Sequence, residues 1–224
     1  MPAVDLNADV AEGLDVVDRD LLEVVTSANV ACGFHAGGEE TARAVCALAA
    51  ERGVAIGAHV GYRDRDGFGR RELGLPAATI AAEAAEQLAA LQQWSGGLVA
   101  YVKPHGALYH RASADAECAA ALVRAAAGLP MLAMPGSELL ALAGDRGVPE
   151  GYADRGYRAG SLVPRGEPGA VLEADAAAAQ AVRLAREGVV RSLCVHGDTP
   201  GASALARRVR EALEAEGVEL RPFA

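Results

Sequence analysis

Residues 98–106 read Leu-Val-Ala-Tyr-Val-Lys-Pro-His-Gly, an apolar run that ends in a lysine, a proline and a histidine. Alanine-rich stretches of helical character precede it at 77–94 and follow it at 115–127. A short apolar run between helical stretches is typical of a buried strand in a parallel sheet. Lys103 stands out because the chain has twenty arginines and no other lysine. Unlike a guanidinium, an ammonium can lose its proton when desolvated, so this position indicates a chemical role.

The same alternation of apolar runs and helical stretches extends along the chain. It predicts seven βα units in one domain, residues 1–224, and an α/β fold with a parallel barrel. A doubly wound open sheet is the alternative, because periodicity does not report closure. The expected strands are 4–7, 28–33, 55–60, 98–103, 131–135, 151–154 and 192–196, and the expected helices are 14–25, 39–52, 77–94, 115–127, 137–146, 175–187 and 202–216. Residues 218–223 are a candidate terminal strand, and 156–170 form one long functional loop.

Charge and cysteine content limit the possible classes of protein. The net charge of −9 and the pI near 5.1 argue against partners such as nucleic acid or an anionic membrane. No apolar stretch reaches the roughly 18 residues of a membrane span, and no signal peptide is evident. The four cysteines are far apart and form no CxxC pair, which indicates free thiols in a reduced, cytoplasmic compartment.

Ionisable side chains gather where the expected strands end. All the histidines of the chain fall in these segments, namely His35, His59, His105, His110 and His196. The C-terminal ends of parallel strands form one face of such a fold, and catalytic groups collect there. The sequence therefore predicts an active site at one mouth of the barrel.

Seven segments together resemble the LamB/YcsF family, in the family's order and over nearly the whole chain. They are DLNADVAEG (5–13), VTSANVACGFHAG (25–37), GAHVGYRDRDGFGRR (57–71), VKPHGALYH (102–110), YADRGY (152–157), LVPRG (162–166) and CVHGDTP (194–200). The resemblance implies an irregular seven-stranded β/α barrel, TIM-barrel-like and related to the glycoside hydrolase/deacetylase superfamily. One departure concerns the first loop, where Ala11 stands in place of the usual glycine.

The resemblance also implies an activity, ATP-dependent opening of the lactam 5-oxoproline to L-glutamate. The family enzyme works as a complex with 5-oxoprolinase subunits B and C. ATP, with Mg²⁺, would phosphorylate the lactam oxygen and make the ring carbon open to attack by water. This chain has no GxxxxGK[ST] sequence, so we expect the partner subunits to phosphorylate and this chain to open the ring.

Within the matched segments, we expect Asp5 or Asp9 to activate water together with His105. Lys103 would stabilise an oxyanion or a phosphate oxygen as a point charge, so Lys103→Met should abolish turnover and leave the thermal midpoint nearly unchanged. Arginine forks at the mouth would recognise carboxylate or phosphate. The expected substrate-binding residues are Asn7, Asn29, His35, His59, Arg70, Arg71, Asp154, Arg155, Arg165, His196 and Asp198.

The sequence assigns no residue as a metal ligand, but a bound transition metal stays open. Asp5 or Asp9 with several histidines (His35, His59, His105 and His196) could supply a nitrogen and oxygen site suited to zinc. Two rival functions also stay open. One is a metal-dependent deacetylase or amidohydrolase acting without ATP, and the other is a non-catalytic subunit that binds a small ligand.

Overall fold

The structure, a computed structural model, describes residues 3–13, 15–198 and 201–224. Within these ranges seven parallel strands form one sheet whose last strand pairs with the first, so the sheet closes into a barrel. The predicted parallel barrel is confirmed, and the open doubly wound sheet is excluded. In order around the barrel, the strands are β1 (Ala3–Val10), β2 (Ser27–Ala31), β3 (Ala55–Val60), β4 (Val99–Pro104), β5 (Met131–Ala133), β6 (Gly147–Tyr152) and β9 (Ser192–Val195).

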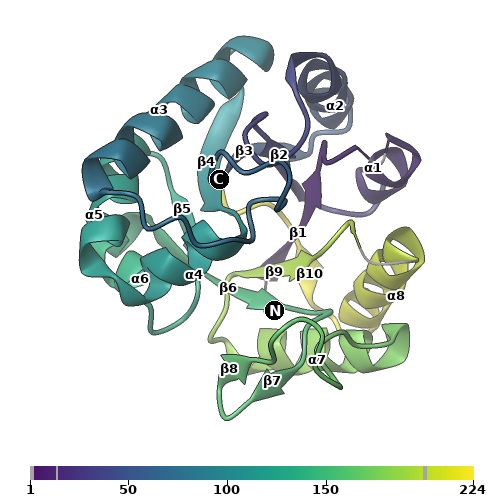
Figure 1. Cartoon of the computed structure of the whole chain (residues 1–224). Coiled ribbons are helices and arrows are strands. Elements are labelled where there is room, and N and C mark those ends of the chain that lie inside the picture. The colour runs from purple at the N-terminus through teal and green to yellow at the C-terminus, as the bar shows by residue number, and fades with distance from the viewer. Residues whose placement is uncertain (1–2, 14, 199–200) are drawn as a thin grey trace.

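Helices surround the barrel as an outer ring (Figure 1). Their small side chains face inward at helical spacing, as in α2, where Ala42, Val45, Cys46 and Ala49 are buried. The helices are α1 (Asp15–Leu21), α2 (Glu39–Glu51), α3 (Ala77–Trp94), α4 (Gly106–Ala114), α5 (Ala116–Ala125), α6 (Glu138–Ala143), the short 3-10 helix η1 (Gly144–Arg146), α7 (Ala174–Glu187) and α8 (Ala202–Ala215).

Besides shifts at the ends of elements, such as β1 continuing beyond 7 and α1 ending before 25, the structure differs from the predicted elements in the following ways. The strand expected from 151 begins at Gly147, and β4 leads directly into α4, which the sequence pattern did not predict. The loop at 156–170 contains a small hairpin of β7 (Tyr157–Arg158) and β8 (Ser161–Leu162). The candidate terminal strand shortens to β10 (Glu219–Leu220), which pairs with the start of β1. Leu14, the expected start of the first helix, lies outside the described residues.

Strand β1 shows how the sequence separates two interiors. Leu6, Ala8 and Val10 belong to the apolar core between the strands and the helices. The alternate residues Asp5, Asn7 and Asp9 are also buried, and their bonds to other strands place them inside the barrel. The inside of this barrel therefore contains a polar column along β1, while most of the hydrophobic core is the layer around the barrel, with a smaller apolar cluster of Tyr101, Leu132 and Val148.

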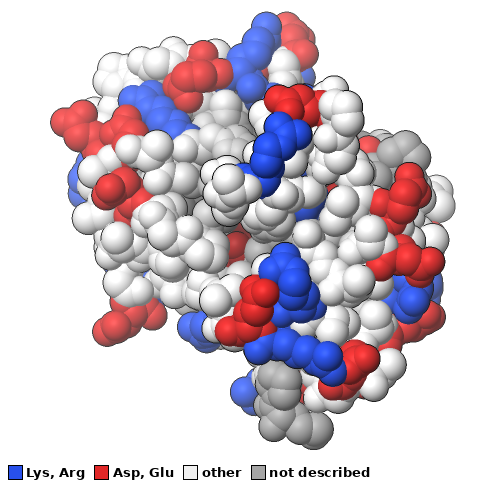
Figure 2. Space-filling view, turned by 90° about the horizontal axis from the view of Figure 1, so that it is seen from below, with Lys and Arg blue, Asp and Glu red and all other residues white. Residues whose placement is uncertain are grey.

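On the face seen in Figure 2, basic side chains lie beside acidic ones. In the described part of the chain, no helix combines the length and the apolar character that crossing a membrane requires. The four cysteines are buried and unpaired.

Candidate active site

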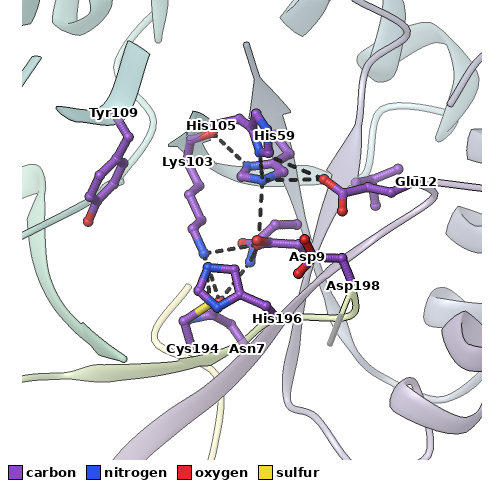
Figure 3. A network of polar contacts seen from close by, with 12 residues as sticks. Asn7, Asp9, Glu12, His59, Lys103, His105, Tyr109, Cys194, His196 and Asp198 are labelled. Atoms are coloured by element: carbon purple, nitrogen blue, oxygen red, sulfur yellow. Dashed lines mark hydrogen bonds and ion pairs between the residues drawn. The ribbon is translucent and has the colours of Figure 1, made fainter. Parts of the chain in front are cut away.

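Lys103 lies at the centre of the polar column, on β4, and is only 2% exposed (Figure 3). Its Nζ donates to Asp9 Oδ1 at 3.0 Å, forms an ion pair with Glu150 Oε1 at 3.0 Å and lies 3.0 Å from Cys194 Sγ. Burial by itself lowers the pKa of Lys103, but the Asp9 carboxylate and its neighbours outweigh burial. The pKa of Lys103 is therefore well above its ordinary value, and the side chain is a fixed cation.

Both asparagines of the chain hold this centre in place. Asn29 Nδ2 donates to Asn7 Oδ1 at 2.7 Å and to Asp9 Oδ1 at 2.9 Å. Asn7 Nδ2 donates to Glu150 Oε1 at 3.0 Å, and the Tyr101 hydroxyl donates to Asn29 Oδ1 at 2.8 Å. The expected substrate-binding role of Asn7 and Asn29 therefore becomes a positioning role, because their amides are occupied by the carboxylates beside Lys103.

Asp9 is the carboxylate of β1 that reaches the mouth. Burial raises its pKa, but the charges of His59 and Lys103 outweigh that effect and hold the pKa of Asp9 well below its usual range. Asp5, two inward positions lower on the same strand, accepts hydrogen bonds from the hydroxyls of Thr26, Ser27 and Ser192. Burial raises the pKa of Asp5 to about 6. Asp5 does not line the cavity at the mouth, so of the two candidates only Asp9 stands there.

Three histidines and Glu12 form a compact group beside Asp9, here called the histidine cluster. Glu12 Oε1 lies 3.2 Å from His35 Nε2, 3.7 Å from His105 Nδ1 and 4.0 Å from His59 Nε2. His59 Nε2 lies 3.0 Å from His105 Nδ1 and 3.5 Å from Asp9 Oδ1. His59 therefore lies between the two groups, Asp9 and His105, that we expected to act together.

Two backbone carbonyls orient the rings of the histidine cluster. Because a carbonyl can only accept, His59 Nδ1 is the donor to the Lys103 carbonyl at 3.2 Å. In the same way, His105 Nε2 is the donor to the Phe68 carbonyl at 2.8 Å. His35 stacks on His105 with 3.9 Å between ring centroids. Both rings of the His59–His105 pair thus turn their other nitrogen toward Glu12.

The charge state of the histidine cluster follows from its burial. Burial lowers the pKa of His35 and of His105 well below the ordinary value, so both rings are neutral near pH 7. Burial also raises the pKa of Glu12 to about 7. Gly69 closes the group from outside, with a positive φ of 65°, and a Cβ there would lie 2.8 Å from His105 Cδ2. Glycine alone fits that position without moving the ring.

His196 and Asp154 form a second acid–base pair at the mouth. His196 Nδ1 lies 3.0 Å from Asp154 Oδ1, and its backbone N–H donates to Asp154 Oδ2 at 3.1 Å. Burial lowers the pKa of His196, but the Asp154 carboxylate outweighs it and leaves the pKa above its ordinary value. The ring also stacks on Tyr152, which fixes its plane. His196 therefore meets the cavity as a ring that Asp154 holds in place and whose protonated form Asp154 favours.

The predicted arginines separate into three groups. Arg70 and Arg165 both pair with Asp198 at the rim, from opposite sides of the mouth. Arg155 is buried and donates to the carbonyls of Ala170 and Val163, so it orders the loop at 156–170, and it also lines the cavity. Arg71 binds Asp64 outside the cavity, and the expected substrate contact of Arg71 is not supported.

A cavity of about 570 Å³ opens above these groups. Its wall includes members of the Lys103 centre, the histidine cluster and the His196 pair, together with arginines of the rim. The lining residues that bear on the chemistry are Asp9, His59, Arg70, Lys103, His105, Tyr109, Tyr152, Arg155, Arg165 and His196. The segments that sequence reasoning selected therefore do converge on one mouth.

Sequence reasoning missed four residues of this mouth, Glu12, Tyr109, Glu150 and Cys194. Glu12 and Cys194 stand inside the family-like segments, next to residues that were selected. Glu150 was hidden because the sixth strand was expected to begin at 151, which left it in a loop. Tyr109 donates to Glu150 Oε2 at 2.9 Å, a contact that depends on the unpredicted α4.

Known proteins share the architecture of this chain. The solved structure of the lactam utilization protein from Thermus thermophilus matches with a TM-score of 0.89 and 40% identity, over 99% of this chain and 100% of that one. The family 4 carbohydrate esterase from Streptomyces lividans matches with a TM-score of 0.63 over 100% and 93% of the two chains. At 13% identity it shows the fold alone.

Sequence relatives lead to the same group. The chain is 53% identical over 249 residues to the A subunit of 5-oxoprolinase from Streptomyces avermitilis, covering 99% of this chain and 100% of that protein. The family model described as LamB/YcsF family matches residues 4–224. This chain therefore belongs to the LamB/YcsF family.

Proposed function

We propose that this chain is the A subunit of an ATP-dependent 5-oxoprolinase, which opens 5-oxo-L-proline to L-glutamate. The observation that carries the proposal is the mouth itself. A cation at Lys103, a carboxylate at Asp9 and the imidazole of His196, held by Asp154, face one cavity. Hydrolysis of a lactam needs these three functions, namely charge stabilisation, a base for water and an acid for the ring nitrogen. The full-length similarity to the 5-oxoprolinase protein of Streptomyces avermitilis supports the same substrate class.

The roles follow from position. Asp9, kept ionised by Lys103, takes a proton from water as its oxygen bonds to the lactam carbon. His196 gives a proton to the ring nitrogen as the carbon–nitrogen bond breaks, and Asp154 holds its ring. When the lactam oxygen is phosphorylated, this step leaves an acyl phosphate, and its hydrolysis by a second water releases phosphate and glutamate. His105 contributes through His59, which connects it to Asp9. Lys103 acts by its charge, since its ammonium is already surrounded by Asp9, Glu150 and Cys194.

The rim suits an anionic substrate. Arg70 and Arg165 share the single carboxylate of Asp198, so an incoming carboxylate or phosphate can take the place of Asp198 on either fork. In 5-oxoproline that group is the carboxylate on the ring, and in a phosphorylated lactam it is also the phosphate.

We place phosphorylation by ATP, with Mg²⁺, in partner subunits B and C, because this chain has no Walker A sequence. The buried free thiols support a reduced, cytoplasmic setting for the complex. Reconstitution tests the proposal: 5-oxoproline and ATP are incubated with this chain alone and then with the candidate partners, while glutamate and phosphate are measured. Glutamate should form only with all subunits present.

Two other results would reject this division of labour. ATP hydrolysis by this chain alone with 5-oxoproline would place phosphorylation here. Release of glutamate by this chain without ATP would favour the metal-dependent amidohydrolase instead.

A further inference from the structure

The histidine cluster contains an arrangement of nitrogen and oxygen atoms that the proposed roles of His59 and His105 do not explain. His59 and His105 each donate a ring N–H to a backbone carbonyl. A neutral imidazole has one N–H, so with both rings neutral His59 Nε2 and His105 Nδ1 present lone pairs that face each other at 3.0 Å. The carboxylate of Glu12 points at the same space. Acceptors that converge in this way in a buried site need either a shared proton or a metal ion between them.

The spacing of the three acceptors fits a metal ion. Glu12 Oε1, His59 Nε2 and His105 Nδ1 form a triangle with sides of 3.0, 3.7 and 4.0 Å. A point equidistant from the corners of such a triangle lies about 2.1 Å from each, within the range of zinc bonds to nitrogen and oxygen, about 2.0–2.2 Å. The gap therefore has the size of a transition-metal ion.

The surroundings also have the form of a metal site. Histidine ligands usually donate their second N–H to a carbonyl or carboxylate, which fixes the ring, and both rings here do so. His35 Nε2, 3.2 Å from Glu12 Oε1, holds the carboxylate in the same way. His35 Nδ1 is buried without a hydrogen-bond partner in the described part of the chain, as expected when the single N–H of the ring is on Nε2. His59 and His105 line the cavity, which gives an ion a path of entry.

A second group at the mouth, Asp9, Cys194 and His196, also has metal-binding residue types close together. That group already holds a cation, because Lys103 Nζ lies 3.0 Å from both Asp9 Oδ1 and Cys194 Sγ. His196 Nδ1 is turned to Asp154 instead. The ammonium of Lys103 would repel a metal ion bound in this second group, so the histidine cluster is the better place for an ion.

We propose that Glu12 Oε1, His59 Nε2 and His105 Nδ1 bind one divalent transition-metal ion, Zn²⁺ or an ion of similar ligand preference. His35 is a positioning residue that holds Glu12. Three protein ligands leave a position open toward the cavity, the arrangement of catalytic rather than structural zinc sites. When bound, the ion would supply Lewis-acid polarisation of a substrate oxygen.

The test measures binding alone, without ATP, 5-oxoproline or partner subunits, so it stands apart from the reconstitution. The full chain, purified without a histidine tag and freed of metal with a chelator, is titrated with Co²⁺ by visible absorption and with Zn²⁺ by calorimetry. We expect one ion per chain, visible bands for Co²⁺, their loss when Zn²⁺ is added, and a higher thermal midpoint with Zn²⁺. A wild-type chain that takes up neither ion would overturn the proposal, whatever the variants do.

Variants locate the ion. His105→Ala and Glu12→Gln should each weaken Zn²⁺ binding at least about 100-fold, and His35→Ala about 10–100-fold, the usual effect of a residue that orients a ligand. His110→Ala is the matched control on α4 and His196→Ala the control for the second group, and both should bind as wild type. Thermal unfolding of each metal-free variant verifies its fold. Binding lost in His196→Ala and retained in His105→Ala would overturn the assignment.

Discussion

Asp5 and Asp9 occupy the same face of the same strand, yet their chemistry is opposite. Asp5 lies among hydroxyl groups, and burial raises its pKa to about 6. Asp9 lies beside His59 and Lys103, whose charges outweigh its burial and hold its pKa well below the usual range. The lower part of the polar column thus raises the pKa of a carboxyl group, and the mouth lowers it. Position along the barrel axis, rather than residue type, decides which carboxylate can act as a base.

The largest expected effect comes from removing the cation that separates these two environments. Lys103→Met leaves Asp9 and Glu150 buried without their partner. Breaking a buried pair in this way costs about 3–5 kcal/mol of unfolding free energy. We therefore expect lost turnover together with a lower thermal midpoint, in place of the unchanged midpoint that the sequence alone predicted. Chemical denaturation and the reconstituted assay measure the two effects.

A double-variant comparison makes the cause specific. Adding Asp9→Asn to Lys103→Met should restore part of the lost stability, because the uncompensated charge is removed. Adding Asp5→Asn to the same background should not show this coupling, because Asp5 does not contact Lys103. Equal coupling energies of Asp5 and Asp9 with Lys103 would show that the mouth and the lower part of the polar column act as one electrostatic unit.

The next effect concerns the acid at the mouth. Asp154→Asn removes the carboxylate that raises the pKa of His196, so the imidazolium should lose its proton at lower pH. If His196 is the acid, the alkaline limb of the kcat/KM profile of the complex should move to lower pH. Activity near pH 8 should fall about 10²–10⁴-fold, the usual contribution of acid–base catalysis. Asp145→Asn, on the surface, is the control, and an unmoved limb in Asp154→Asn would reject the assignment.

Asp5 predicts a pH dependence of stability rather than of activity. The folded chain holds this proton more tightly than the unfolded chain, because burial raises the pKa from 3.8 to about 6. The resulting stability is fully present below pH 3.8 and is lost as the pH rises through 6. That difference corresponds to about 3 kcal/mol. Unfolding free energies of wild type and Asp5→Asn, compared between about pH 4 and about pH 7.5, should diverge in favour of the variant as the pH rises.

Subtraction of the two curves isolates Asp5 from the other groups that titrate in this range. Parallel curves would mean that the hydroxyls of Thr26, Ser27 and Ser192 stabilise the ionised form of Asp5 as well as water does.

The sequence could predict which residues face the barrel interior but not their height in it. The alternation along β1 places Asp5, Asn7 and Asp9 on one face, and strand ends mark the mouth. The predicted strand ended at 7, whereas β1 continues to Val10. Period-two patterning contains no information on where a strand stops relative to its neighbours, so Asp5 and Asp9 were equivalent candidates. Register across the closed sheet separates them.

The missing partners of Lys103 have a related cause. Its uniqueness among the basic residues predicted that it matters, and the structure places it at the centre of the site. Its contact with Glu150 depends on β4 and β6 reaching the same interior across the short β5. No local pattern reports a contact between side chains so far apart in the chain, so Glu150 could be found only after the barrel closed.

The smallest effect is expected where β1 leaves the barrel above Asp9. Ala11 has a positive φ of 61° and is fully buried, at the position where the family resemblance places glycine. Ala11→Gly should relieve about 1 kcal/mol of left-handed strain. It also removes a buried methyl group worth about 0.8 kcal/mol and adds freedom to the unfolded chain. These terms nearly cancel, so we expect a change within about 0.5 kcal/mol by chemical denaturation. A gain clearly above about 1 kcal/mol would mean that strain at this turn, which also sets the direction of Glu12, is larger than the packing that offsets it.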